Sequence, residues 1–221
     1  MILALHLPDG FLSLERAALG WLLAVLVVAI ALRMGVSDRQ IPRMGVLAAA
    51  VFAAQCIAFP IVGGTSAHLL GAALAAIILG PWAAVLVLTV VVGIEATLLQ
   101  DGGLLAMGWN LVNMAVFGAL LGGVVFSALR NAPGAFVAGF LTAEMGAIAA
   151  AQEMGQTIPT SVSLPVMAVS HAVVGLVEGC ATAAAFLLLL RARPDAVCAN
   201  APGQRLAALI VIACGLVVAL L

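Results

Sequence analysis

The chain has 221 residues, of which 66% are hydrophobic and 8% are charged, and its formal net charge is −1. A mean hydropathy of +1.31 excludes a soluble globular domain, in which about half of the residues are apolar and about a quarter are charged. The near-neutral charge gives no electrostatic basis for binding nucleic acid or an anionic surface. The composition therefore predicts one integral membrane domain over residues 1–221.

The apolar segments are continuous and rich in Ala, Leu and Val, which is typical of membrane helices and not of the alternating strands of an outer-membrane barrel. A spanning helix needs roughly 20 residues. We therefore predict an all-α polytopic bundle of about eight transmembrane helices, near residues 13–33, 43–60, 66–80, 82–100, 104–130, 134–152, 162–191 and 204–221. The third segment is short, so fusing it with the fourth gives a seven-helix alternative.

The arginines indicate how the bundle is oriented, because short cytoplasmic loops are enriched in basic residues. With eight helices and the N-terminus outside, Arg16 alone lies away from the cytoplasmic side. The seven that lie on it are Arg33, Arg39, Arg43, Arg130, Arg191, Arg193 and Arg205. A seven-helix drawing divides these arginines between both sides, so the pattern favours an even number of crossings and an external N-terminus.

Two of the three histidines lie in short polar stretches, His6 in LHLPDGF and His68 in GGTSAHLLG. In the predicted orientation both belong to the external face, together with Asp9, Asp101 and Glu153. An imidazole is costly to bury in a membrane protein without a partner, so this pair indicates a bound metal ion. The simpler alternatives are an interfacial histidine bonded to a loop carbonyl for His6 and a histidine of a capping loop for His68.

The residues before His68 predict a helix start. Pro60 ends the second apolar segment, and Thr65 or Ser66 is expected to cap the next helix with His68 in its first turn. A helix N-terminus disfavours a protonated imidazole, so this position favours the neutral, metal-binding form.

Asn110 and Asn113 are three residues apart and share a helix face. Their amides are expected either to form hydrogen bonds between helices or to orient a metal-binding imidazole by a hydrogen bond without binding the metal themselves. Thr65 and Ser66 are candidates for the same orienting role.

Four ionisable residues lie inside apolar segments, where they are candidates for function by default. They are Glu95, Glu144, His171 and Glu178. His171 and Glu178 are seven residues apart and share a helix face, which predicts either a polar relay or a structural pair.

Small residues also recur at helical spacing, as at Ala17, Gly20, Ala24 and Ala31. Such a face lets helices approach closely, either inside the bundle or against a partner membrane protein.

Four stretches carry a specific pattern: LHLPDGFLS, FAAQCIAFPIVGGTSAHLLGAALAAIILGPWAAVLVLTVVV, DGGLLAMGWNLVNMAVFG and HAVVGLVEG. Together they resemble the cobalt/nickel substrate-binding membrane component (S component) of energy-coupling factor ABC transporters, the CbiM/NikM family. The resemblance covers most of residues 6–180.

The resemblance implies a planar set of four nitrogen ligands for Ni²⁺ or Co²⁺, the transported substrate. In that family the mature chain begins Met-His, and the ligands are the terminal amine, the second backbone nitrogen, its imidazole and an imidazole of the GGTSxH loop. The imidazoles correspond to His6 and His68. Here Leu5 precedes His6, so its amine is freed only if residues 1–4 are removed. Otherwise the extended chain binds metal with other groups, or the site is degraded.

The resemblance further implies high-affinity metal capture at the external face of a prokaryotic inner (cell) membrane. The expected partners are a coupling transmembrane subunit, ATPase subunits and a small accessory membrane subunit. The chain is not expected to be an enzyme, since it contains no GxxxxGK[ST] phosphate loop. The alternatives are a structural or assembly subunit of a larger membrane complex and an ion-coupled permease.

Overall fold

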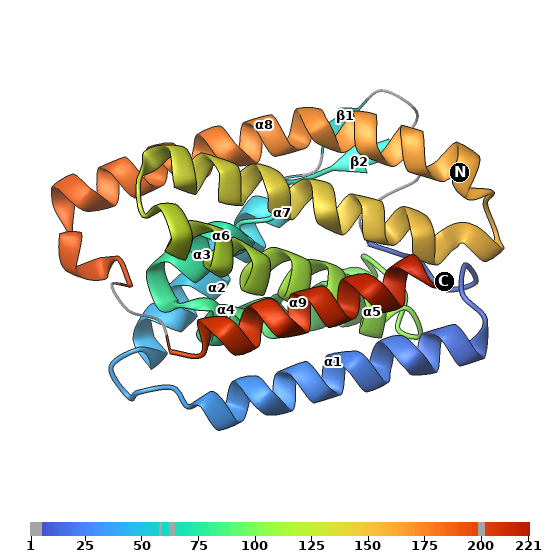
Figure 1. The fold of residues 1–221 in the computed structure, drawn as a ribbon, viewed down its shortest axis with the longest axis horizontal. Helices are drawn as coiled ribbons and strands as arrows, with labels where there is room; N and C mark the ends of the chain where they lie inside the picture. Colours follow the sequence, from blue (N-terminus) through green and yellow to red (C-terminus); the bar gives the residue numbers. More distant parts are fainter. Residues whose placement is uncertain (1–5, 58, 62–64, 199–201) are drawn as a thin grey trace.

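The structure, a computed structural model, describes residues 6–57, 59–61, 65–198 and 202–221, with the backbone alone for residues 59–61, 65 and 66. Its helices lie side by side along the long axis of the molecule (Figure 1). The main helices are α1 (Leu14–Met34), α2 (Ile41–Gln55), α3 (Ala72–Leu79), α4 (Pro81–Ile94), α5 (Met107–Leu111), α6 (Leu121–Leu129), α7 (Ala132–Glu153), α8 (Thr160–Ala192) and α9 (Gln204–Ala219).

Short helical segments join or extend several of these helices. The π-helix η1 (Glu95–Leu99) continues α4, and the π-helix η2 (Val112–Leu120) joins α5 to α6. The 3₁₀ turns η3 (Met154–Gln156) and η4 (Pro194–Ala196) follow α7 and α8. Joined in this way, the described residues form eight helical segments at the places that the hydropathy predicts.

The eight segments differ in length. Five of them are long and apolar enough to cross a membrane: Leu14–Met34, Pro81–Leu99, Met107–Leu129, Ala132–Gln156 and Thr160–Ala192. α2 and α9 are shorter apolar helices, and α3 has 8 residues. The predicted shortness of the third segment is confirmed. Gly80, at φ 84°, ends α3, and Pro81 begins α4, as a proline at the first helical position is suited to do.

A short β-hairpin between α2 and α3 corrects the sequence prediction. β1 (Phe59–Ile61) pairs antiparallel with β2 (Thr65–Ala67). We expected helix up to residue 60 and again from residue 66. The physical reason for the difference is local: Pro60 has no amide hydrogen for a helix, and the Gly-Gly-Thr-Ser sequence that follows has low helix propensity.

The loops that carry most of the arginines lie at one end of the bundle, on the left of Figure 1. There Arg43 Nη2 is 3.8 Å from Asp195 Oδ2, and the amide of Cys198 donates to the carbonyl of Ile77 at 2.9 Å. Arg16 lies at the other end, where its guanidinium donates to the carbonyl of Glu153 at 3.2 Å. Most arginines therefore lie at one end of the bundle, as the arrangement with eight helical segments predicts. Which of the two ends faces outside stays a prediction.

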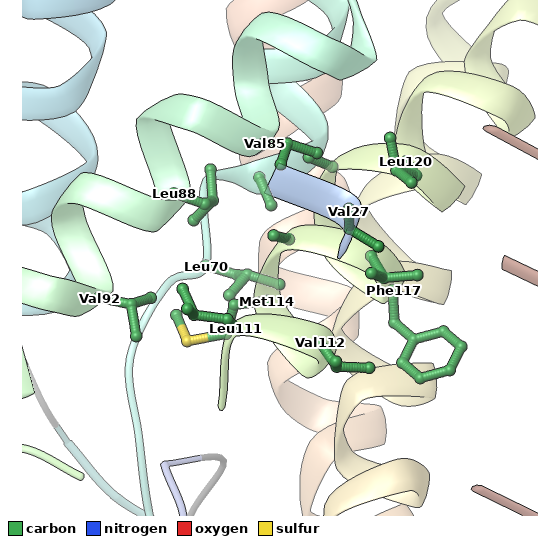
Figure 2. Close-up of a cluster of buried hydrophobic side chains, with 14 of the residues drawn as sticks. Val27, Leu70, Val85, Leu88, Val92, Leu111, Val112, Met114, Phe117 and Leu120 are labelled. Carbon is green, nitrogen blue, oxygen red and sulfur yellow. The ribbon is translucent and has the colours of Figure 1, made fainter. Parts of the chain in front are cut away.

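The core lies around α4 and η2, and it reaches the neighbourhood of both polar stretches. Figure 2 shows Leu70, Leu111 and Met114 together in this cluster, to which Leu88 of α4 also belongs. Leu70 and Met114 are at most 2% exposed. Because Leu70 follows His68 by two residues, the core holds the chain next to that histidine in place.

The small residues of α1 pack inside the bundle. Ala17, Gly20, Ala24 and Ala31 are all buried. A Cβ at Gly20 would lie 2.5 Å from the ring of Trp109, whose Nε1 donates to the carbonyl of Arg16 at 2.7 Å. The alternative in which this face is free to dock a partner protein is therefore wrong.

Candidate metal-binding site

The N-terminal segment is tied to the start of the α5–η2 helix by the residue that follows His6. The amide of Leu7 donates to Asn110 Oδ1 at 2.7 Å, and the Leu7 carbonyl accepts from Asn110 Nδ2 at 3.1 Å and from the Gly103 amide at 2.8 Å. Asn110 thus holds the backbone beside His6, and the imidazole itself is buried, with 4% of the residue exposed.

Asp9 makes a second contact between the N-terminal segment and the residues before α5. The sequence did not single out Asp9 as a site residue. Its carboxylate accepts from the amides of Leu104, Leu105 and Ala106 at 3.1, 2.8 and 3.1 Å. A Cβ at Gly103 would collide with the Asp9 side chain, so a glycine is required there. The Pro-Asp-Gly sequence is a turn signal, but its partner lies nearly a hundred residues away and leaves no local trace.

The structure brings His68 to His6, with their ring centroids 5.0 Å apart and their planes at 64°. His68 Nδ1 is 3.1 Å from the Leu69 carbonyl. A carbonyl only accepts, so Nδ1 carries the proton and the lone pair of Nε2 is free for a metal. Burial, together with the charge of His6, lowers the pKa of His68 to about 4. The imidazole is therefore neutral at pH 7.

The predicted capping arrangement around His68 is wrong. α3 begins at Ala72, after Gly71 at φ 68°, so His68 precedes the helix instead of lying in its first turn. Thr65 and Ser66 belong to β2 and do not cap α3. The neutral imidazole follows from burial and not from a helix terminus.

Two carboxylates and a thioether surround the ring of His6. Nε2 is 2.8 Å from Met114 Sδ and 3.9 Å from Glu95 Oε2, and Nδ1 is 3.2 Å from Asp101 Oδ1. The contact with His6 lowers the pKa of the Asp101 carboxyl, against the opposing effect of burial. Glu95 Oε2 is buried and has no hydrogen bond among the described residues. The Asp101 carboxylate therefore places negative charge beside the imidazole, where it would favour a cation.

The imidazoles of His6 and His68 are the nitrogen donors that the described side chains bring together. Within the described ranges, no three or more His, Cys, Asp or Glu side chains are grouped so as to hold a metal ion. A complete ligand set therefore needs other donors. The predicted amine donor, Leu5, lies outside the described residues, as do the side chains of Thr65 and Ser66.

Asn113 lies one turn from Asn110 and bonds elsewhere. Its Nδ2 donates to Glu153 Oε2 at 2.9 Å, which joins η2 to the end of α7. The next residue, Met114, is the one that contacts His6.

His171 and Glu178 share a buried face of α8 but bond to different groups. His171 Nδ1 is 3.0 Å from the carbonyl of Met167 within the same helix. The carboxylate of Glu178 accepts from the amides of Leu70 and Gly71 at 2.8 and 2.7 Å. Glu178 thus contacts the segment that carries His68, which the sequence spacing did not indicate.

Comparison with known proteins identifies the family. The family described as CbiM, the cobalt uptake substrate-specific transmembrane region, matches residues 6–196. The chain belongs to the CbiM family. It is 40% identical over 218 residues to the putative fused nickel transport protein NikMN of Archaeoglobus fulgidus, covering 95% of this chain and 73% of that protein. It is 37% identical to the cobalt transport protein CbiM of Sorangium cellulosum, covering 86% of this chain and 93% of that protein.

Solved structures show the same fold as this CbiM-family chain. A crystal structure of a transition metal transporter matches it with a TM-score of 0.78 at 30% identity, covering 84% of this chain and 92% of that one. A truncated transition metal transporter matches with a TM-score of 0.77, also at 30% identity, covering 84% of this chain and 98% of that one. The resemblance in the sequence is confirmed, and the chain is a transmembrane component of cobalt or nickel uptake.

Proposed function

We propose that this CbiM-family protein captures Ni²⁺ or Co²⁺ with high affinity at the external membrane face, as the substrate-binding component of an energy-coupling factor transporter. The observation that carries the proposal is the 5.0 Å approach of the His6 and His68 rings. They meet at the end of the bundle away from most arginines, and nitrogen donors suit these two ions better than Mg²⁺ or Ca²⁺.

The ligand set depends on the N-terminus. If residues 1–4 are removed, the Leu5 amine and the His6 backbone nitrogen join the two imidazoles in a four-nitrogen set. If they are retained, the additional donors beside the His6 ring are Met114 Sδ and Glu95 Oε2 near Nε2 and Asp101 Oδ1 near Nδ1. Mass spectrometry of the mature N-terminus distinguishes the two forms, and the trimmed form is expected to bind Ni²⁺ more tightly.

The proposed partners are a coupling transmembrane subunit, ATPase subunits and a small accessory membrane subunit in a prokaryotic cell membrane. The chain contains no phosphate-binding loop of the GxxxxGK[ST] type, so we propose that ATP hydrolysis belongs to the partners. The relative from Archaeoglobus fulgidus is described as a fused protein of which this chain covers 73%, which supports an additional component beside it.

Isothermal titration of the purified protein with Ni²⁺ and Co²⁺ tests the proposal. His6→Ala and His68→Ala are expected to weaken binding at least a hundredfold, because each removes a ligand. Glu144→Gln is the control, since Oε1 of this buried glutamate of α7 has no hydrogen bond among the described residues, and the Kd is expected to stay unchanged. Wild-type affinity no tighter than millimolar, together with no effect of His68→Ala, would refute metal capture.

A further inference from the structure

We propose that Glu178 is a positioning residue that holds His68 where it binds the metal. This inference rests on the proposed function. Glu178 is 2% exposed, and both of its carboxylate oxygens are used: Oε2 accepts from the Leu70 amide at 2.8 Å and Oε1 from the Gly71 amide at 2.7 Å. These two amides belong to the second and third residues after His68.

The carboxylate is fixed from its own side by close packing between α8 and α7. A Cβ at Gly139 of α7 would lie 2.9 Å from the backbone oxygen of Glu178, and one at Gly179 would lie 2.8 Å from the carbonyl of Phe136. Glycines at both positions therefore let the two helices meet at the level of Glu178. The position of the carboxylate along the bundle is set by this helix contact.

The peptide that Glu178 binds is also held from the other side. The Leu70 carbonyl accepts from Gln55 Nε2 at 2.8 Å, and the Leu70 side chain lies in the core (Figure 2). His68 Nδ1 in turn bonds to the Leu69 carbonyl at 3.1 Å. The Leu69 carbonyl and the Leu70 amide belong to the same peptide unit, so two hydrogen bonds through this one peptide connect the α8 carboxylate to the imidazole.

A carboxylate is the group that this arrangement needs. It offers an acceptor to each amide, whereas a glutamine of the same size offers one acceptor and turns its own N–H groups toward the other amide. The start of α3 beside it adds a favourable partial positive charge. Burying an ionisable side chain inside a membrane protein costs free energy. The hydrogen bonds of Glu178 to the segment that carries His68 therefore point to a role in the geometry of the site.

The test compares Glu178→Gln with Glu144→Gln. Removing a group that orients a metal ligand typically costs about 10- to 100-fold in affinity. We expect Glu178→Gln to raise the Kd for Ni²⁺ by that factor and to shift the visible absorption of the Co²⁺ complex, which reports ligand geometry. Glu144 is also a buried glutamate of a membrane helix, on α7, and its Oε1 has no hydrogen bond among the described residues. Glu144→Gln is expected to leave both readouts at wild-type values.

The outcomes separate this inference from the proposed function. Absence of Ni²⁺ and Co²⁺ binding by the wild type refutes the proposed function. Wild-type binding with an unchanged Kd and Co²⁺ spectrum in Glu178→Gln refutes only the positioning role. Should the glutamine variant not fold, Glu178→Asp replaces it, with a Kd above wild type in support and an unchanged Kd against. Amide exchange in the wild type adds a reading that needs no variant: slow exchange at Leu70 and Gly71 supports the contact, and exchange as fast as in an exposed loop overturns it.

Discussion

His68 shows how a buried imidazole is kept ready for a metal. Its Nδ1–H donates to the Leu69 carbonyl, and burial beside His6 lowers the pKa, which disfavours protonation of Nε2. The lone pair of Nε2 is therefore available at neutral pH without competition from a proton, which a surface histidine with a pKa near 6.5 would not guarantee at slightly acid pH.

The lowered pKa of His68 predicts a pH dependence of stability. In the unfolded chain His68 takes up its proton near pH 6.5, whereas in the native protein it does so near pH 4. The unfolded state therefore binds more protons between these values, and stability falls as the pH decreases through this window, by at most about 3 kcal/mol. NMR of the metal-free protein should show His68 titrating near 4. Titration near 6.5 would contradict the burial argument, and His68→Ala should remove this part of the pH dependence.

Asp9 allows a second test at a single side chain. Asp9→Ala leaves the three amides of Leu104, Leu105 and Ala106 without their acceptor. By analogy with the loss of a helix cap, we expect a loss of about 1–2 kcal/mol in stability, and weaker Ni²⁺ binding because the segment carrying His6 loosens. Thermal unfolding in detergent and metal titration measure the two effects. Asp38→Ala, in an exposed turn at the other end, serves as the control, and an equal effect there would count against a specific role for Asp9.

At the level of elements, the contact of α1 with α5 depends on the absence of side chains. A Cβ at Gly20 would lie 2.5 Å from the Trp109 ring, and one at Gly108 would lie 2.3 Å from the Trp21 amide nitrogen. Trp109 precedes Asn110, the residue that binds the Leu7 backbone. The packing of α1 is therefore connected to the position of His6.

Gly20→Ala is expected to destabilise the protein by about 1–3 kcal/mol, because the added methyl group overpacks the contact with Trp109. Gly215→Ala in α9 is the matched control. A Cβ there meets nothing within 4 Å, so its stability should be unchanged or slightly higher. Thermal unfolding of both variants gives the comparison, and equal melting temperatures would show that the α1–α5 contact relaxes without cost.

The elements also show what the sequence could and could not predict. Hydropathy located all eight helical segments, because each must bury an apolar stretch long enough to be detected. The hairpin was missed, since Phe59–Ile61 is as apolar as a helix and three residues show no periodicity. His6 and His68 were expected together because both precede a segment that starts at the same end. The sequence did not predict the hydrogen bonds of Asp9 and Glu178. In each case the partner lies about a hundred residues away, and no local sequence pattern marks either side of the contact.

For the whole molecule, the unequal distribution of arginine between the two ends predicts the direction of capture. Arg43 and the loops around it lie at one end, and the two histidines lie near the other, with Arg16. Short arginine-rich loops remain in the cytoplasm. The histidine end should therefore face outside, where a metal ion arrives.

Labelling of introduced cysteines tests this orientation. After replacement of the native cysteines, Thr160→Cys reports the histidine end, at the exposed start of α8, and Ser37→Cys reports the arginine end, in the exposed turn between α1 and α2. In intact cells a membrane-impermeant maleimide is expected to label Thr160→Cys and not Ser37→Cys, whereas both should react after lysis. The reverse pattern would place His6 and His68 at the cytoplasmic side, where they could release a metal but not capture one from outside. Because the labelling needs no metal, it tests the orientation separately from the ligand set.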